Sequence, residues 1–95
     1  MWIILNLDNE SIVNISIPST VAVSDSGFVF LSSTGETFTL NEVGRFIYRQ
    51  FHEGVDVEDV TRNTMEEFDV ERNALERDLS EFIAQLMLYG LLERR

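Results

Sequence analysis

Residues 36–54 read ETFTLNEVGRFIYRQFHEG, and the spacing of the apolar side chains changes within this stretch. Phe38 and Leu40 alternate with threonine, and this period of two is typical of a strand with one buried face. From Asn41 onward, apolar residues recur every three or four positions, which is the period of an amphipathic helix. The chain therefore changes from strands to helices near Leu40.

The residues before this point predict an antiparallel sheet. The first 40 residues contain four acids, no base, seven Ser and four Thr, together with many β-branched side chains. Glycine-containing turns at 25–27 (DSG) and 33–35 (STG) separate three apolar stretches. We expect three consecutive antiparallel strands, which are VAVSD (21–25), FVFLSS (28–33) and ETFTL (36–40).

One or two further strands are predicted upstream. Residues 11–17 (SIVNISI) alternate apolar and polar side chains until Pro18 ends the run. Residues 1–7 (MWIILNL) are apolar but lack the basic start of a signal peptide, so we expect a strand of a cytoplasmic protein. Residues 1–17 are thus expected as an additional strand or hairpin that extends the sheet, covers an edge or makes a dimer contact.

Three helices are predicted after Leu40. The first helix has Asn41 as its candidate N-cap and ends near Gly54, which suits the left-handed conformation found after many helices. The second helix begins after Asp56, whose carboxylate can accept a hydrogen bond from the Asp59 amide.

The third helix is the longest that the pattern predicts, starting near Asp69 and ending at Gly90. Its apolar stripe consists of Leu75, Leu79, Phe82, Ile83 and Leu86. Ala84, Met87 and Leu88 lie off this stripe and are also apolar. The C-terminal end of the helix is therefore either clamped between layers or presented to a partner.

These elements predict a single α+β domain over residues 1–95, because 95 residues suffice for one hydrophobic core but not for two ordinary domains. Residues 18–40 supply an antiparallel sheet of three or more strands, with 1–17 as the additional segment. Residues 41–95 supply the three-helix part. This order of strands and helices is winged-helix-like.

The chain is strongly acidic, since seven Arg and no Lys face 17 Asp and Glu and give a formal net charge of -10. Nucleic-acid phosphates and anionic lipid surfaces repel such a chain, which disfavours both as partners. All seven Arg follow Leu40, whereas the predicted strands carry only acids. A partner that pairs with the strands should therefore be basic or neutral.

No catalytic, metal or cofactor site is predicted. The chain has no cysteine, and the single histidine, His52, lies at the expected end of the first helix, where the helix dipole accounts for it. The acidic pairs lack a calcium-binding loop, and neither a glycine-rich phosphate loop nor a serine-hydrolase motif is present. We expect a binding protein rather than an enzyme.

A set of residues in a fixed order links residues 18–93 to a known family. The set consists of Pro18, Val21, Gly27-Phe28, Leu40-Asn41, Phe46-Ile47, Gly54, Val57, Val60, Asp78, Phe82, Leu86, Gly90, Leu91 and Leu92. With these spacings, the chain resembles the PqqD-like family, which is named for a small protein of pyrroloquinoline quinone biosynthesis.

The resemblance implies a noncatalytic module that recognises peptides. In this family, the leader of a ribosomally made precursor peptide adds as a strand to the last strand of the sheet, beside the third helix. It is thereby presented to a modifying enzyme, often a radical S-adenosylmethionine enzyme. Carried to this chain, the strand is Glu36 to Leu40 and the helix is about Val70 to Tyr89. The expected partners are the precursor peptide and the modifying enzyme, and the chain is a monomer or homodimer.

The resemblance also implies which residues contact the peptide. They are Thr37, Phe38, Thr39, Leu40, Arg72, Leu75, Leu79 and Ile83. The strand residues would pair through their main chains, the helix residues Leu75, Leu79 and Ile83 would form an apolar wall, and Arg72 would attract an acidic leader residue. We therefore expect acidic leader residues to be tolerated only towards Arg72 and Arg77.

Other hypotheses stay open. Leu79 and Phe82 could be plain core residues, and Thr37 and Thr39 could be ordinary positions of an edge strand. The chain could instead be an acidic adaptor that docks onto a basic protein or oligomerises through the apolar end of the third helix. A winged-helix regulator is a further hypothesis, which the acidic third helix disfavours.

Overall fold

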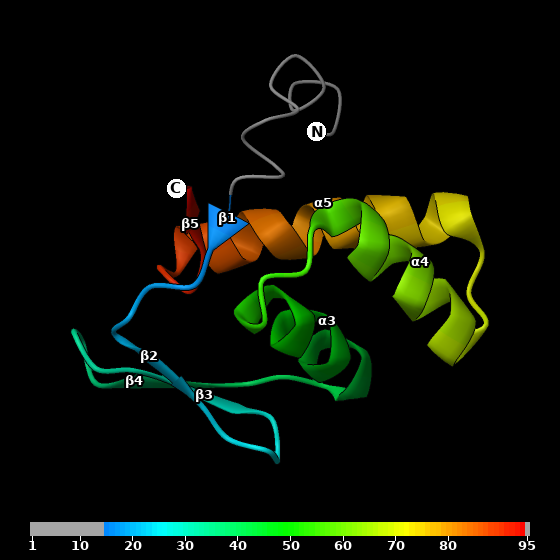
Figure 1. Cartoon of the computed structure of the whole chain (residues 1–95). Coiled ribbons are helices and arrows are strands. Elements are labelled where there is room, and N and C mark those ends of the chain that lie inside the picture. The colour runs from blue at the N-terminus through cyan, green and yellow to red at the C-terminus, as the bar shows by residue number, and fades with distance from the viewer. Residues whose placement is uncertain (1–14, 95) are drawn as a thin grey trace.

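The computed structural model describes residues 15–94. Its elements are β1 (Ile15–Ser16), β2 (Val21–Val23), β3 (Phe28–Leu31), β4 (Glu36–Thr39), α3 (Glu42–His52), α4 (Val57–Phe68), α5 (Arg72–Leu88) and β5 (Glu93–Arg94) (Figure 1). Strands followed by three helices confirm the predicted α+β fold. The strand predicted at residues 1–7 and the first part of 11–17 lie outside the described residues.

The three predicted strands form one antiparallel sheet in the order β2-β3-β4. Its inner face is apolar because alternate residues point to the core, and Val29 of β3 is fully buried. Its outer face carries Phe28 and Phe30, which remain 50% and 42% exposed. Among the described residues, no strand pairs with the outer side of β4, so β4 is an edge strand.

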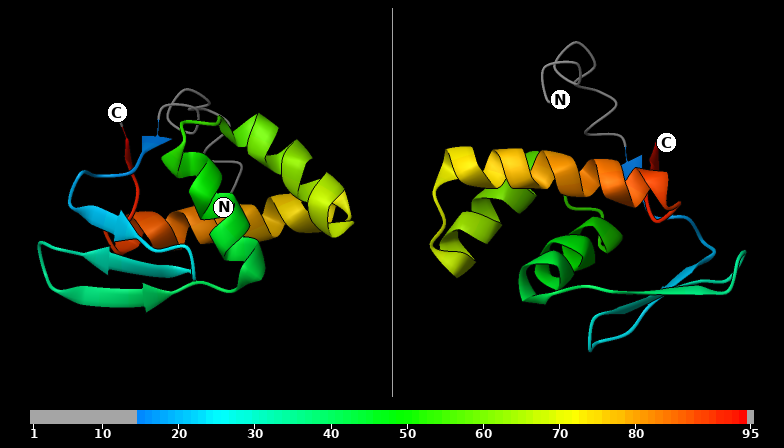
Figure 2. Two further views of the ribbon diagram at one scale, coloured as in Figure 1. Left: turned by 60° about the horizontal axis from the view of Figure 1, so that its bottom comes forward. Right: turned by 180° about the vertical axis from the view of Figure 1, so that it is seen from behind.

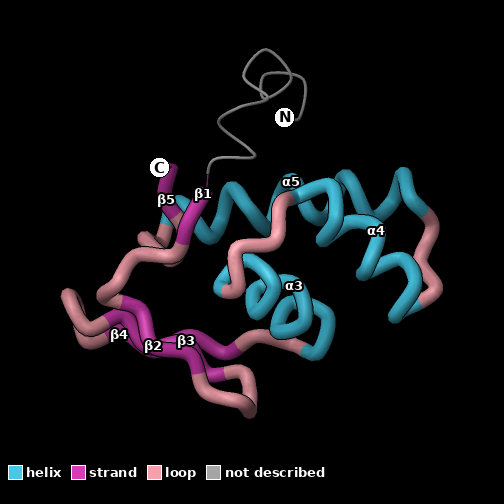
Figure 3. Tube along the Cα trace, in the orientation of Figure 1, coloured by secondary structure: helices cyan, strands magenta, loops and turns pink. Residues whose placement is uncertain are grey.

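A second, two-stranded sheet joins the two ends of the described chain. β1 pairs with β5, with Ile15 opposite Arg94 and Ser16 opposite Glu93, and Figure 3 shows this pair apart from the larger sheet. β5 was not predicted from the sequence, because two polar residues have no periodicity that distinguishes a strand from a loop.

The predicted caps of α3 and α4 are confirmed. The Asn41 side chain accepts a hydrogen bond from the Gly44 amide at 2.8 Å, and the Asp56 carboxylate accepts one from the Asp59 amide at 2.9 Å. At the end of α3, Gly54 has a φ of 85°, the left-handed conformation that glycine adopts without steric cost. Each of these helices therefore begins where the sequence pattern indicates.

The predicted start of the third helix near Asp69 is wrong. Asp69 instead ends α4, with a φ of 53° and its amide donating to the Met65 carbonyl at 3.0 Å. Aspartate tolerates this left-handed conformation better than most non-glycine residues, so it can also end a helix. α5 begins three residues later, and the Glu71 carboxylate caps it by accepting from the Ala74 amide at 3.1 Å.

α3 lies between the three-stranded sheet and α5, as the front and back views show (Figures 1 and 2). The buried side of α3 contributes Ile47, Tyr48 and Phe51 to a core that also takes in α4, α5 and the sheet. The Tyr48 hydroxyl donates to the Leu91 carbonyl at 2.7 Å, and burial raises the pKa of Tyr48. This bond ties α3 to the segment after α5.

The helices of residues 15–94 are too short or too polar to cross a membrane.

Candidate functional site

A groove with a volume of about 650 Å³ lies between β4, the start of α3 and α5. On the strand side it is lined by Phe38, Thr39 and Leu40, and on the side of α3 by Val43 and Gly44, among others. These residues lie in the stretch where the chain changes from strand to helix. The segment in which the apolar spacing changes from that of a strand to that of a helix therefore also forms one wall of the groove.

The opposite wall is one face of α5. It includes Ala74, Asp78, Glu81 and Gln85, with Tyr89 directly after the helix, and these residues follow one another at spacings of three or four. Residues at these spacings lie on the same side of a helix. At one end of the groove, Tyr89 packs on Phe38 with a distance of 5.3 Å between ring centroids. This contact joins the two walls.

The register of the sheet determines which main-chain groups of β4 remain unpaired. The Leu40 amide donates to the Gly27 carbonyl at 3.0 Å, so Leu40 directs its main-chain groups towards β3. In an antiparallel pair, successive residues alternate in this respect. Phe38 therefore also faces β3, whereas Thr37 and Thr39 direct their N–H and C=O groups to the free edge.

The pairing on the other side of β3 supports this register. Phe28 lies opposite Thr39, and its carbonyl accepts a hydrogen bond from the Ser24 amide in the direction of β2, at 2.8 Å. The main chain of Phe28 is therefore directed away from Thr39. Such an edge, whose N–H and C=O groups pair with no strand in the described part of the chain, can receive an additional strand beside the groove.

The groove is acidic. Its lining residues include Asp78 and Glu81 but no arginine or histidine. Among residues 15–94, neither carboxylate has an ion-pair partner. Within this range, no three acidic or histidine side chains gather in a way that could hold a metal ion. The groove therefore combines apolar side chains of β4, α3 and α5 with two carboxylates of α5.

Five of the eight residues expected to contact a peptide line the groove. They are Phe38, Thr39, Leu40, Leu75 and Leu79. Thr37 lies further along the free edge of β4, outside the groove lining. Ile83 is only 2% exposed and belongs to the core cluster. Leu79 is likewise part of that cluster, so it supports the groove as well as lining it.

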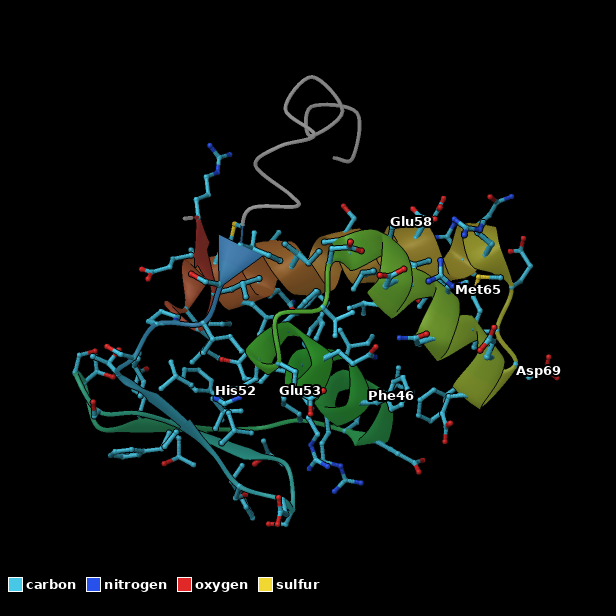
Figure 4. The ribbon with its side chains drawn as sticks, in the orientation of Figure 1. Phe46, His52, Glu53, Glu58, Met65 and Asp69 are labelled. Atoms are coloured by element: carbon cyan, nitrogen blue, oxygen red, sulfur yellow. The ribbon has the colours of Figure 1, made fainter. Side chains whose placement is uncertain are left out.

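Arg72 does not line the groove. Its guanidinium donates to the Glu76 carboxylate at 2.7 Å and forms an ion pair with Glu58 of α4 at 3.4 Å. The hydrogen bond to Glu76 raises the pKa of Arg72. Figure 4 shows Glu58 where α4 approaches α5, on the far side of α3 from the sheet. Arg72 thus connects two helices rather than facing β4.

Several groove residues were not predicted, including Ala74, Glu81, Gln85 and Tyr89. A signal for them exists in the sequence. The stripe that includes Leu75, Leu79 and Leu86 points into the core, and the residues one position earlier, Ala74, Asp78 and Gln85, form the neighbouring stripe. A helix beside an edge strand presents this neighbouring stripe to anything that binds the edge.

A family model described as "Coenzyme PQQ synthesis protein D (PqqD)" matches residues 2–92, so the match includes most of the segment 1–17. No curated protein matches the chain.

Two solved structures have a similar fold. One is TbiB1 in complex with the TbiA(beta) leader peptide, with 31% identity, a TM-score of 0.75, and coverage of 82% of this chain and 94% of that chain. The other is a lasso peptide synthetase B1 complexed with the leader peptide, with 24% identity and a TM-score of 0.73. That likeness covers 83% of this chain and 96% of the synthetase chain.

Proposed function

Because the chain belongs to the PqqD family, we propose that it is a noncatalytic module that binds the leader of a ribosomally made precursor peptide. The leader adds as a strand to the free edge of β4 and lies in the groove beside α5. The observation that carries this proposal is the main chain of Thr37 and Thr39, which the register directs away from β3 and which no other strand of residues 15–94 pairs with.

One solved structure supports the binding of a leader peptide. The relative with 31% identity is a complex with a leader peptide and covers most of this chain. A peptide that pairs with β4 would gain main-chain hydrogen bonds that do not depend on its sequence, and the groove would select its side chains. The proposal extends to a modifying enzyme that receives the bound leader, and the family resemblance favours a radical S-adenosylmethionine enzyme.

A display selection of random 12-residue peptides on the immobilised chain tests the proposal. The enriched peptides are then labelled, and their affinity is measured by fluorescence anisotropy for two variants of one position. Thr39→Pro removes the amide at the free edge, where proline is compatible with an edge strand. Thr39→Val keeps the amide and a β-branched side chain. We expect Thr39→Pro to weaken binding about three- to tenfold relative to Thr39→Val, the effect of one lost main-chain hydrogen bond.

Circular dichroism shows whether both variants keep the same fold. The proposal is overturned if no peptide is enriched, or if folded Thr39→Pro binds the enriched peptides as tightly as Thr39→Val does.

A second candidate function is an adaptor or oligomerisation domain that uses the end of α5. The observation that favours it is Leu88, which is 77% exposed next to the half-exposed Tyr89. If the chain forms a dimer through this end, Leu88→Glu converts it to a monomer in light scattering. Met87 is unsuitable for the same test because it packs partly against the core. A chain whose mass is the same with and without the substitution contradicts this candidate.

A further inference from the structure

The groove differs in chemistry along its length. Phe38 contacts Tyr89 at the end of α5, and the start of α3 lies further along, where a Cβ atom on Gly44 would be 3.4 Å from the Phe82 ring. The strand-to-helix segment therefore follows α5 backwards from its C-terminal end. Along this path the groove begins at an aromatic pair and continues past Glu81 and Asp78.

From this arrangement we propose that the leader carries an arginine or lysine about four positions from an apolar side chain, and that Glu81 and Asp78 bind this basic residue. The apolar side chain packs against Phe38 and Tyr89. This inference rests on the proposed function and adds to it the chemical class of peptide that the groove accepts.

The spacing follows from helix and strand geometry. Glu81 and Asp78 precede Tyr89 by eight and eleven residues. At a helical rise of about 1.5 Å per residue, they lie about 12 and 16 Å from Tyr89 along the axis of α5. An extended peptide advances about 3.3 Å per residue, so it covers the distance to Glu81 in about four residues.

The charges of the described residues favour a basic ligand at this place. Glu81 and Asp78 have no ion-pair partner within residues 15–94, so a ligand does not have to displace one. The arginines within the same range all lie outside the groove lining. The formal net charge of -10 adds a long-range attraction for a positively charged peptide.

This proposal differs from the expectation that acidic leader residues are tolerated only towards Arg72 and Arg77. That expectation depended on which residues of the third helix face β4. Arg72 is held by Glu76 and Glu58, and neither Arg72 nor Arg77 lines the groove. An acidic leader residue in the groove would instead meet the carboxylates of Asp78 and Glu81.

The test compares two double variants that change the net charge equally. Asp78→Asn/Glu81→Gln removes both carboxylates from the groove. Glu66→Gln/Glu67→Gln removes two exposed carboxylates of α4 that do not line the groove. Random 12-residue peptides are selected by display on the unchanged chain and on each variant, and the enriched peptides are sequenced.

On the unchanged chain and on Glu66→Gln/Glu67→Gln, we expect enrichment of Arg or Lys about four positions from an apolar residue. On Asp78→Asn/Glu81→Gln, this preference should disappear. A peptide selected on the unchanged chain should bind the groove variant about five- to tenfold more weakly, as expected for two partly exposed charge pairs. Replacing its basic residue with glutamine should weaken binding to the unchanged chain but not to the groove variant.

Two results overturn the inference while the proposed function stands. One is enrichment of peptides that need the Thr39 amide but show no basic preference. The other is an equal loss of affinity in both double variants, which would mean that only the overall charge attracts the peptide. Failure to enrich any peptide overturns the proposed function as well as the inference.

Discussion

The hydrogen bond that Tyr48 makes contributes to the stability of the whole fold. It is fully buried in α3, and its hydroxyl donates to the carbonyl of Leu91, in the segment that follows α5. A buried carbonyl that loses its donor costs free energy, because no water replaces the lost hydrogen bond. The residue is therefore important for the position of α5 against α3, and α5 forms one wall of the groove.

Tyr48→Phe should lower the free energy of unfolding by about 1 to 3 kcal/mol, since it leaves the Leu91 carbonyl buried without a donor. The measurement is urea unfolding followed by circular dichroism. Tyr89→Phe is the matched control, because Tyr89 is half exposed and its hydroxyl has no partner among the described residues. Equal stability of the two variants would show that the bond to Leu91 contributes nothing.

The sequence predicted some residue positions of the candidate site and missed others for a physical reason. The places of Phe38 and Leu40 could be predicted, because side chains alternate along a strand and these two therefore point to the same face. The main-chain direction of Thr37 and Thr39 depends on the pairing register with β3, and periodicity in one strand contains no information about its partner. The ion pair of Arg72 with Glu58 could not be predicted, because it depends on how two helices pack.

At the scale of elements, capping residues determine where each helix begins. The Asp56 carboxylate accepts a hydrogen bond from the Asp59 amide at 2.9 Å and precedes α4. Asp56→Ala should therefore lower the free energy of unfolding by about 1 kcal/mol. Thermal unfolding by calorimetry measures the change, with Glu66→Ala in the exposed middle of α4 as the control. A control variant that is as unstable as Asp56→Ala would contradict the role of the cap.

The elements themselves were largely predictable. The sequence contains local signals for them, and each signal is found in the structure. These signals are the two caps, the two turns of the hairpins and the glycines after α3 and α5. The start of α5 was not predictable. Aspartate is favoured both as the residue before a helix and as the left-handed residue that follows a helix. Asp69 has the second role, and only the packing of α4 against α5 distinguishes the two.

At the scale of the whole molecule, the acidic charge has two different consequences. The overall value of -10 was an argument against nucleic acid and membrane surfaces. The fold determines where part of this negative charge lies, because it brings Asp78 and Glu81 to a groove whose other wall includes β4. Net charge alone contains no information about this arrangement, since it depends on the orientation of α5 relative to β4.

Successive residues of β4 direct their main-chain groups to opposite sides. This alternation restricts the registers in which another strand can pair with β4. Of the four residues of β4, only Thr37 and Thr39 direct their main-chain groups away from β3, so an added strand can shift along β4 in steps of two residues but not of one. A shift of one residue would exchange the two faces of the bound strand. Side chains that enter the groove together must therefore be separated by an even number of positions, and a single-residue insertion between them would place one of the two in solvent.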